Sequence, residues 1–299
     1  MFYEHIHIPV MLSEISKYLI QNIYGVYVDC TFGNGGHTFY LLNKFKNIKI
    51  IAIDWDEQSL YRFNENKFND RVIFIRDNFK NIKQILSNLH IDKVDGILAD
   101  IGISSQQLND LSRGFSFKSP RLDMRMDNRL KITAQTIINS TSANNLANIF
   151  YRYGEEYQSR KIANSICIHR KQKCINSAKE LQNIVCAAKT RKRLNRRRRR
   201  TKIHTATKVF QALRIVVNSE LDNLQQLLSI APELLNCTGR VVIVSFHSLE
   251  DRMVKLNFKH NTCNGIYKTI TKKVIKVSKD ELNNNFRVRS ARMRVAEKQ

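Results

Sequence analysis

The sequence predicts an α/β fold in which a helical domain interrupts a parallel sheet. Between residues 26 and 100, runs of apolar β-branched residues alternate with polar stretches of helical spacing. The runs are nearly continuous in apolar residues, as strands buried on both faces are. Each run ends at or just before an acidic residue, and the alternation stops after residue 101, while strand signal resumes at residue 240. This order is typical of a Rossmann-like sheet built from both ends of the chain.

Five parallel strands are expected, and the pattern places them at residues 26–30, 48–53, 72–75, 94–99 and 240–245. The fifth follows a long helical pattern at 206–235, whose apolar positions recur every three or four residues. We expect Ser248 to cap the next helix, with Asp251 adding negative charge to its first turn. Short apolar stretches at 267–277 and 288–295 fit a final antiparallel pair.

The same pattern divides the chain into two domains. Residues 1–105 and 206–299 form a discontinuous sheet domain, and residues 106–205 form the inserted helical domain. The six cysteines are far apart and form no metal-binding pair, so we expect reduced thiols and no metal. No apolar run approaches the ~20 residues of a membrane span, and the amino end has no signal-peptide core. The sequence therefore predicts a cytoplasmic protein with no membrane partner.

Charge is the strongest compositional feature. The 299 residues include 50 Lys and Arg against 26 Asp and Glu, a formal charge of +24, which favours an acidic partner such as nucleic acid. Ten of these cations lie in the basic segment 189–202, which has no acid, and the rest of the chain keeps 24 − 10 = +14. The segment is either a phosphate-binding arm or a solvated insertion, and the role of the run from Arg196 to Arg200 stays open.

A glycine-rich loop, DCTFGNGGH at residues 29–37, follows the first expected strand. Three of the ten glycines fall within four positions here. Glycine lets the backbone turn tightly and approach a ligand without a Cβ in the way. The loop therefore predicts a cofactor site, and its spacing is not that of the G-x-G-x-x-G dinucleotide motif.

Acidic residues at successive strand ends strengthen this interpretation. Asp54 lies about 20 residues past the loop, where a carboxylate can accept hydrogen bonds from ribose hydroxyls, and Asp56 is a nearby rival. Asp77 and Phe79 follow the third strand, where they could meet an adenine amino group and ring face. Asp100 ends the fourth. The set describes a nicotinamide dinucleotide or an S-adenosylmethionine site, and the lack of a pyrophosphate cradle favours S-adenosylmethionine.

Longer motifs run in series from residue 7 to residue 297. They are HIPVMLSE, DCTFGNGGH, AD-x-G-x-SSQQ, RGFSF, LDMRMD, YGEE, ATKVFQALRI, SFHSLEDRMVK and RSARMRVAE. In this order they resemble the bacterial ribosomal RNA small-subunit methyltransferase H family. The resemblance implies a Rossmann-like S-adenosylmethionine-dependent methyltransferase whose inserted domain recognises the substrate. It also implies methylation of the exocyclic N4 of a cytidine in 16S rRNA, at the decoding centre of the small ribosomal subunit.

Motif by motif, the resemblance assigns cofactor contacts to the glycine loop, to the ends of the second and third strands and to the region after the fourth. The implied residues are Gly35, Gly36, His37, Asp54, Phe79, Asp100 and Gln107. Of these, His37 and Gln107 rest on the resemblance alone. Asp100 is also the candidate catalytic residue, because either it or a backbone carbonyl of residues 101–104 is placed to accept a hydrogen bond from the target amine. His247, after the fifth strand, is a second candidate proton acceptor.

Three other functions stay open at this point. The chain could methylate DNA, or be a non-catalytic RNA-binding ribosome assembly factor that retains the fold, although the intact glycine loop and acids speak against the latter. A nicotinamide oxidoreductase has the least support, because the glycine spacing is wrong. The sequence also leaves open whether the chain forms a homodimer.

Overall fold

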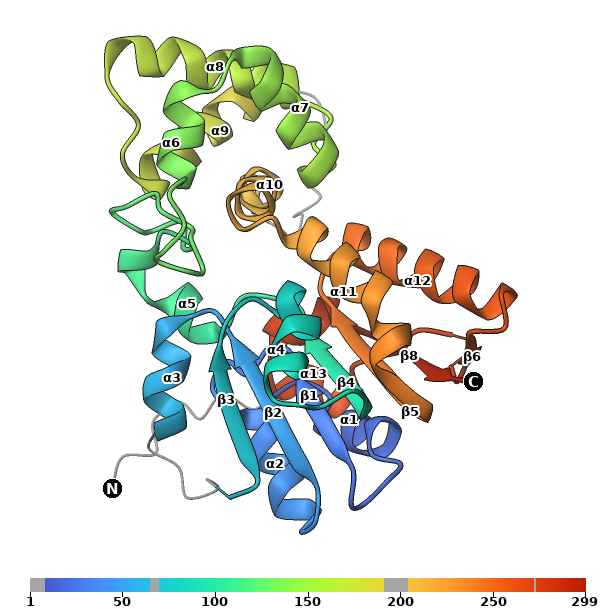
Figure 1. The fold of residues 1–299 in the computed structure, drawn as a ribbon. Coiled ribbons are helices and arrows are strands. Elements are labelled where there is room, and N and C mark those ends of the chain that lie inside the picture. Colours follow the sequence, from blue (N-terminus) through green and yellow to red (C-terminus); the bar gives the residue numbers. More distant parts are fainter. Residues whose placement is uncertain (1–8, 65–69, 191–203, 272) are drawn as a thin grey trace. The chain divides into compact units, whose positions relative to one another are not determined.

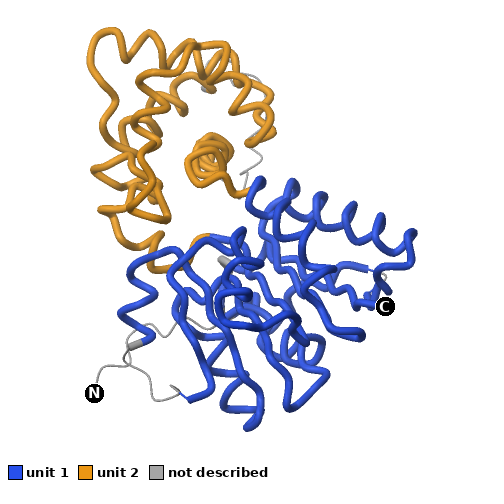
Figure 2. Tube along the Cα trace, in the orientation of Figure 1, with its two compact units in different colours: residues 1–102, 221–299 blue, residues 103–220 orange. Residues whose placement is uncertain are grey.

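The computed structural model describes residues 9–64, 70–190, 204–271 and 273–299 (Figure 1). Most of the basic segment, from residue 191 onward, and the start of the HIPVMLSE motif lie outside these ranges. The chain forms two compact units, which Figure 2 shows in different colours: Met1–Gly102 with Leu221–Gln299, and Ile103–Glu220. Among the described residues, no helix is both long enough and apolar enough to cross a membrane.

The first unit is built on an eight-stranded sheet. Its strands are β1 (Val26–Asp29), β2 (Lys49–Asp54), β3 (Val72–Arg76), β4 (Val94–Asp100), β5 (Leu235–Ser245), β6 (Tyr267–Thr269), β7 (Ile275–Lys276) and β8 (Arg292–Lys298). The order is β3-β2-β1-β4-β5-β8-β6, with β7 also paired to β8. Strands β1 to β5 are parallel, and β8 is antiparallel to each of its neighbours. All five predicted parallel strands and the final antiparallel pairing are therefore confirmed.

Helices cover both faces of this sheet. They are α1 (Leu12–Leu19), α2 (Gly36–Lys44), α3 (Glu57–Asn64), α4 (Ile82–Asn88), α11 (Glu220–Leu234), α12 (Ser248–Cys263) and α13 (Lys279–Asn284), with short 3-10 turns η1 (Phe79–Asn81) and η3 (Phe286–Ser290). Successive strand residues enter opposite cores: Val28 packs with α4, α11 and α12, and Tyr27 packs with α1 and α2. Burial on both faces explains why the strand sequences are continuously apolar.

The second unit is helical, and none of its described residues is in a strand. Its elements are α5 (Ser105–Asn109), η2 (Leu111–Arg113), α6 (Ala134–Ser140), α7 (Ala143–Gly154), α8 (Ser159–Gln172), α9 (Ala178–Thr190) and α10 (Thr207–Asn218). Helix α7 packs against α8 and α10, and α8 packs against α9. A Cβ on Gly154 would lie 2.4 Å from the Lys208 carbonyl oxygen, which shows how closely α7 and α10 approach.

The division of the chain differs from the expected boundaries at residues 105 and 206. Because α10 packs on α7, it lies with the inserted unit and not with the sheet. The helical pattern at 206–235 is two helices, separated at Ser219, which has a φ of +49°. Asn218, just before it, accepts a hydrogen bond from the Met126 N–H and donates one to the Met124 carbonyl. These tertiary bonds end α10 inside an apolar pattern that continues through the break.

The start of α12 corrects a second expectation. Ser248 is the first helical residue, and the cap is His247, whose Nδ1 accepts from the Glu250 N–H at 3.3 Å. In return, Glu250 Oε2 accepts from the backbone N–H groups of Phe246 and His247. Asp251 lies in the first turn, as expected, and it also bonds Arg292 and Arg294 of β8. A capping box in which histidine replaces serine was not visible in the sequence pattern.

Candidate functional site

The carboxyl ends of three neighbouring strands bring the predicted acids to one edge of the sheet. Strand β1 lies between β2 and β4, and Asp29 of β1 is in register with Ala52 on one side and Leu98 on the other. Asp54 and Asp100 lie two residues beyond these partners. Such an edge is where ligands bind in open parallel sheets.

The glycine turn between β1 and α2 adopts a conformation that glycine favours. Gly33 and Gly35 have φ values of +56° and +76°. A Cβ on Gly35 would lie 2.1 Å from the Phe39 ring, and one on Gly36 would lie 2.1 Å from Pro9. A Cβ on Gly33 would meet only the Thr31 carbonyl oxygen, at 3.9 Å. Gly35 and Gly36 therefore make room for the protein itself, while Gly33 borders open space.

Asp54, and not its rival Asp56, holds this turn. Asp54 accepts hydrogen bonds from the Gly33 N–H at 2.6 Å and the Asp56 N–H at 2.8 Å, one at each carboxylate oxygen. Each oxygen keeps further capacity to accept. Burial raises the pKa of Asp54 to about 6, against the lowering effect of these hydrogen bonds. Asp56 is buried and accepts from the Gln58 N–H at the start of α3.

The end of β3 gives Asp77 and Phe79 different roles. Asp77 Oδ1 accepts from the Asn78 N–H and from Asn81 Nδ2, so it shapes the turn η1. Phe79, the first residue of that turn, is half-buried and packs against the core shared with α4. Asp77 therefore has a structural use, while Phe79 keeps part of its ring exposed.

Asp100 and His37 form the most unusual part of the site. Asp100 Oδ2 lies 3.9 Å from His37 Nδ1, and Oδ1 is buried with no hydrogen-bond partner among the described residues. The backbone N–H of Asp100 donates to Thr31 Oγ1. Burial raises the pKa of Asp100 to about 6, and proximity to His37 opposes this rise. A buried, unpartnered carboxylate oxygen is costly unless a ligand supplies a donor.

His37 also links the glycine turn to the amino-terminal segment. Its Nε2 lies 2.9 Å from the Val10 carbonyl oxygen. The next residue, Met11, is buried with a φ of +56°, and its N–H donates to Glu281 Oε1 of α13. The sequence pattern missed these partners because they are 27 and 270 residues apart in the chain. A histidine within a glycine turn was the only available signal.

Asp29 lies in the same buried group but has its own partners. It accepts from the Thr31 N–H and from Thr38 Oγ1, at 3.1 and 2.7 Å. Burial raises the pKa of Asp29, and His37 opposes the shift. Asp29 therefore ties β1 to the first turn of α2.

Two other candidate residues have capping roles. Gln107 belongs to the inserted unit, where its Oε1 accepts from the Ser104 N–H and its own N–H donates to Ser104 Oγ. Six of the seven implied cofactor residues thus lie in the sheet unit, and Gln107 lies in the inserted unit. His247 caps α12 through Nδ1, as described above, and its Nε2 lies 2.9 Å from Glu250 Oε1.

The RGFSF and LDMRMD motifs stabilise the inserted unit from within. Arg113 donates to the carbonyl oxygens of Arg125 and Met126. A Cβ on Gly114 would lie 2.4 Å from the Asp123 nitrogen. Burial favours a higher pKa for Asp123, but its two hydrogen bonds from the Arg125 side chain outweigh this and hold the pKa below its usual range. These motifs therefore build a loop and carry no visible chemistry.

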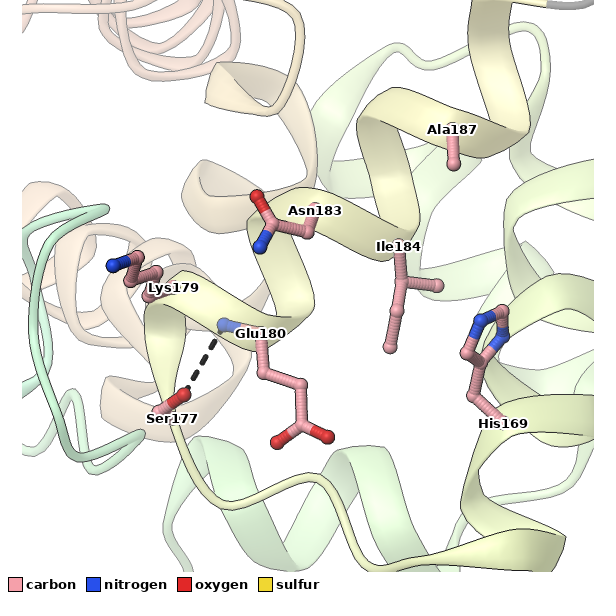
Figure 3. Close-up of a pocket in the computed structure, with 7 residues that line it drawn as sticks. All are labelled: His169, Ser177, Lys179, Glu180, Asn183, Ile184 and Ala187. Atoms are coloured by element: carbon pink, nitrogen blue, oxygen red, sulfur yellow. Dashed lines mark hydrogen bonds between the residues drawn. The ribbon is translucent and has the colours of Figure 1, made fainter.

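A separate pocket of about 470 Å³ lies between α8 and α9 of the inserted unit (Figure 3). His169, Lys179, Glu180 and Ile184 are among the residues that line it. It contains none of the candidate residues, and the Ser177 hydroxyl in its wall accepts from the Glu180 N–H as a helix cap. The candidate site therefore remains the edge formed by β1, β2 and β4.

Comparison with known proteins supports a single family. The model of a family described as the MraW methylase family matches residues 4–299. Ribosomal RNA small subunit methyltransferase H of Endomicrobium trichonymphae is 60% identical over 294 residues, which cover 98% of each chain. The protein of the same name from Desulfotalea psychrophila is 44% identical over 99% of each chain. An rRNA methylase structure from Streptococcus thermophilus covers all of this chain and 98% of its own, at 12% identity and a TM-score of 0.41, too low to support any inference.

Proposed function

This chain belongs to the MraW methylase family, and on that premise we propose that it methylates the N4 of a cytidine in 16S rRNA. The proposed target is at the decoding centre of the small ribosomal subunit, which also places the enzyme in the cytoplasm. One observation supports the chemistry above all others. It is the buried Asp100 oxygen without a partner, beside a glycine turn, at the ligand-binding edge of a parallel sheet.

The methyl donor is S-adenosylmethionine, and the residues at this edge fit its parts. Asp54 would accept hydrogen bonds from the ribose hydroxyls, because its oxygens keep acceptor capacity. Phe79 would lie beside the adenine, and the open space at Gly33 admits the cofactor next to the backbone. The amino acid part carries an ammonium group, and a carboxylate such as Asp100 suits either that group or an amine of the substrate.

S-adenosylmethionine supplies an electrophilic methyl group bound to a positively charged sulfur. In the proposed reaction, the N4 amine would form a bond to the methyl carbon as the carbon–sulfur bond breaks and S-adenosylhomocysteine leaves, and the nitrogen would then give one proton to the Asp100 carboxylate or to solvent. That amine is a weak nucleophile, because its lone pair is delocalised into the ring. Asp100, ionised at neutral pH, would accept its hydrogen bond and raise electron density on the nitrogen. Alignment of the nitrogen with the methyl carbon would lower the barrier further.

We assign substrate recognition to the inserted unit. The net charge of +24 favours an RNA backbone, but charge alone does not select a base. The target base must also leave its stack, at a cost of a few kcal/mol, which is lower if it is already unpaired.

The test is to incubate the purified protein and labelled S-adenosylmethionine with unmodified small-subunit particles, and to identify the labelled nucleoside by mass spectrometry after digestion. We expect N4-methylcytidine. Cofactor binding without any labelled RNA would favour the non-catalytic assembly factor. Equal methylation of naked duplex DNA would favour a DNA substrate.

A further inference from the structure

Two large aromatic side chains, Tyr151 in α7 and Tyr157 between α7 and α8, are mostly exposed to solvent. Tyr157 is 84% exposed and Tyr151 is 56% exposed. Tyr157 is the most exposed large apolar side chain among the described residues. Their ring centroids are 6.4 Å apart, in an edge-to-face arrangement. Both lie within the inserted unit.

A lysine ammonium group lies over the ring of Tyr157. Lys208 Nζ lies 5.5 Å from the centroid of the Tyr157 ring. The same ammonium group donates to the Glu155 carbonyl oxygen at 2.8 Å, which fixes its position. Because Tyr157 remains largely exposed with Lys208 beside it, much of its ring stays open to a ligand.

The surrounding charge is mostly positive, although Glu155, between the two tyrosines in the chain, is half-buried. Arg152 follows Tyr151 directly, Arg160 and Lys161 lie on the first turn of α8, and all three are exposed. Glu156 is buried, and its carboxylate is paired with Lys189 at 2.6 Å. Exposed cations next to exposed aromatic rings are characteristic of surfaces that bind single-stranded nucleic acid.

We propose that Tyr151, Tyr157 and Lys208 form a stacking platform that binds an unpaired base of the RNA substrate. The base would stack on the exposed aromatic surface, while the nearby cations contact the adjoining phosphates. The proposal rests on the rRNA substrate assigned under the proposed function and adds the surface that holds it. Stacking is tolerant of base identity, so the platform supplies affinity and not the choice of cytidine.

Binding of a fluorescently labelled, unstructured RNA oligonucleotide to the full chain tests the platform. We expect Tyr157→Ala to weaken RNA binding about tenfold, since loss of one stacked base has an effect of this order. Tyr157→Trp should restore binding, because it keeps an aromatic face. Tyr24→Ala is the matched control: Tyr24 is 71% exposed but lies in the turn before β1, and its loss should leave binding unchanged.

Turnover on small-subunit particles separates this proposal from the proposed function. We expect Tyr157→Ala to raise KM for the particles and to leave kcat and cofactor binding unchanged. Wild-type RNA affinity in Tyr157→Ala would overturn the platform. So would a variant that binds particles weakly but naked RNA normally, because a ribosomal protein would then contact this surface. If the wild-type chain binds RNA through Tyr157 yet methylates nothing, the platform stands and the proposed function fails.

Discussion

Two carboxylates at the sheet edge, Asp54 and Asp100, hold their protons more strongly than ordinary aspartates. Burial destabilises their charged forms and raises each pKa to about 6. Between the usual aspartate pKa and this value, the folded state binds more protons than the unfolded state, so stability falls as pH rises. At neutral pH both groups are ionised, and Asp100 is a better proton acceptor than an unperturbed aspartate.

The first residue-scale prediction concerns Asp100 itself. Asp100→Asn keeps the shape of the side chain but removes the negative charge that accepts the hydrogen bond. We expect methyl transfer to fall by about 10²- to 10⁴-fold, the usual contribution of a positioned acid–base group, while S-adenosylmethionine binding stays within a few-fold. Single-turnover assays and calorimetry measure the two quantities. Weak cofactor binding with unchanged turnover would instead restrict Asp100 to a cofactor contact.

The second residue-scale prediction concerns pH. Because the ionised form of Asp100 is the acceptor, kcat/KM should fall about tenfold per pH unit below its pKa of about 6 and level off above pH 7. His37 faces this carboxylate at 3.9 Å, so His37→Gln should move the midpoint of the profile upward by removing the nearby imidazole. A profile that is flat between pH 5 and 8 would contradict the assignment of Asp100.

The residue types at this site were predictable, but their partners were not. Acids at strand ends are visible in the sequence because each one ends an apolar run. The contact of His37 with the Val10 carbonyl is not visible, because it joins two segments through tertiary packing. Asp77 bonds to its own turn, which is a local interaction. An acid at a strand end fits a ligand contact equally well, so the sequence does not distinguish the two roles.

At the scale of elements, the glycine turn shows why three similar residues are not equivalent. Gly35 combines a positive φ with two nearby aromatic rings, whereas Gly33 has a positive φ and open space. We expect Gly35→Ala to lower the free energy of unfolding by about 3 kcal/mol, and Gly33→Ala by about 1 kcal/mol. Urea denaturation measures both, and equal losses would show that packing around Gly35 relaxes at no cost.

Helix ends were predicted less well than helices. The apolar period of 206–235 gives no sign of the break at Ser219, because the bonds that end α10 come from Asn218 to a loop about 90 residues away in the chain. The cap of α12 was misplaced by one residue, because Ser is the commoner capping residue and His247 fills that role here. Both errors arise where tertiary or unusual side-chain bonds replace the usual local signals.

At the scale of the whole molecule, parallel-strand patterning predicted the sheet, and charge predicted the class of partner. The +24 charge is spread over both units and the basic segment. One residue of the basic segment has a structural partner: Lys189, in the last turn of α9, forms an ion pair with the buried Glu156. The nine remaining basic residues, between positions 191 and 202, lie outside the described residues and are the part whose role needs a direct test.

The last prediction replaces those nine Lys and Arg by Ser and Gln and retains Lys189, so the formal charge falls from +24 to 24 − 9 = +15. If the segment contacts phosphates, RNA affinity should fall, and the plot of log affinity against log salt should become shallower by about 0.7 per lost contact with a single strand. Cofactor binding and thermal stability serve as controls and should not change. Because counterion release depends on contacts and not on net charge, an unchanged slope would show that the segment is a solvated insertion. In that case RNA binding rests on the charges of the two folded units alone.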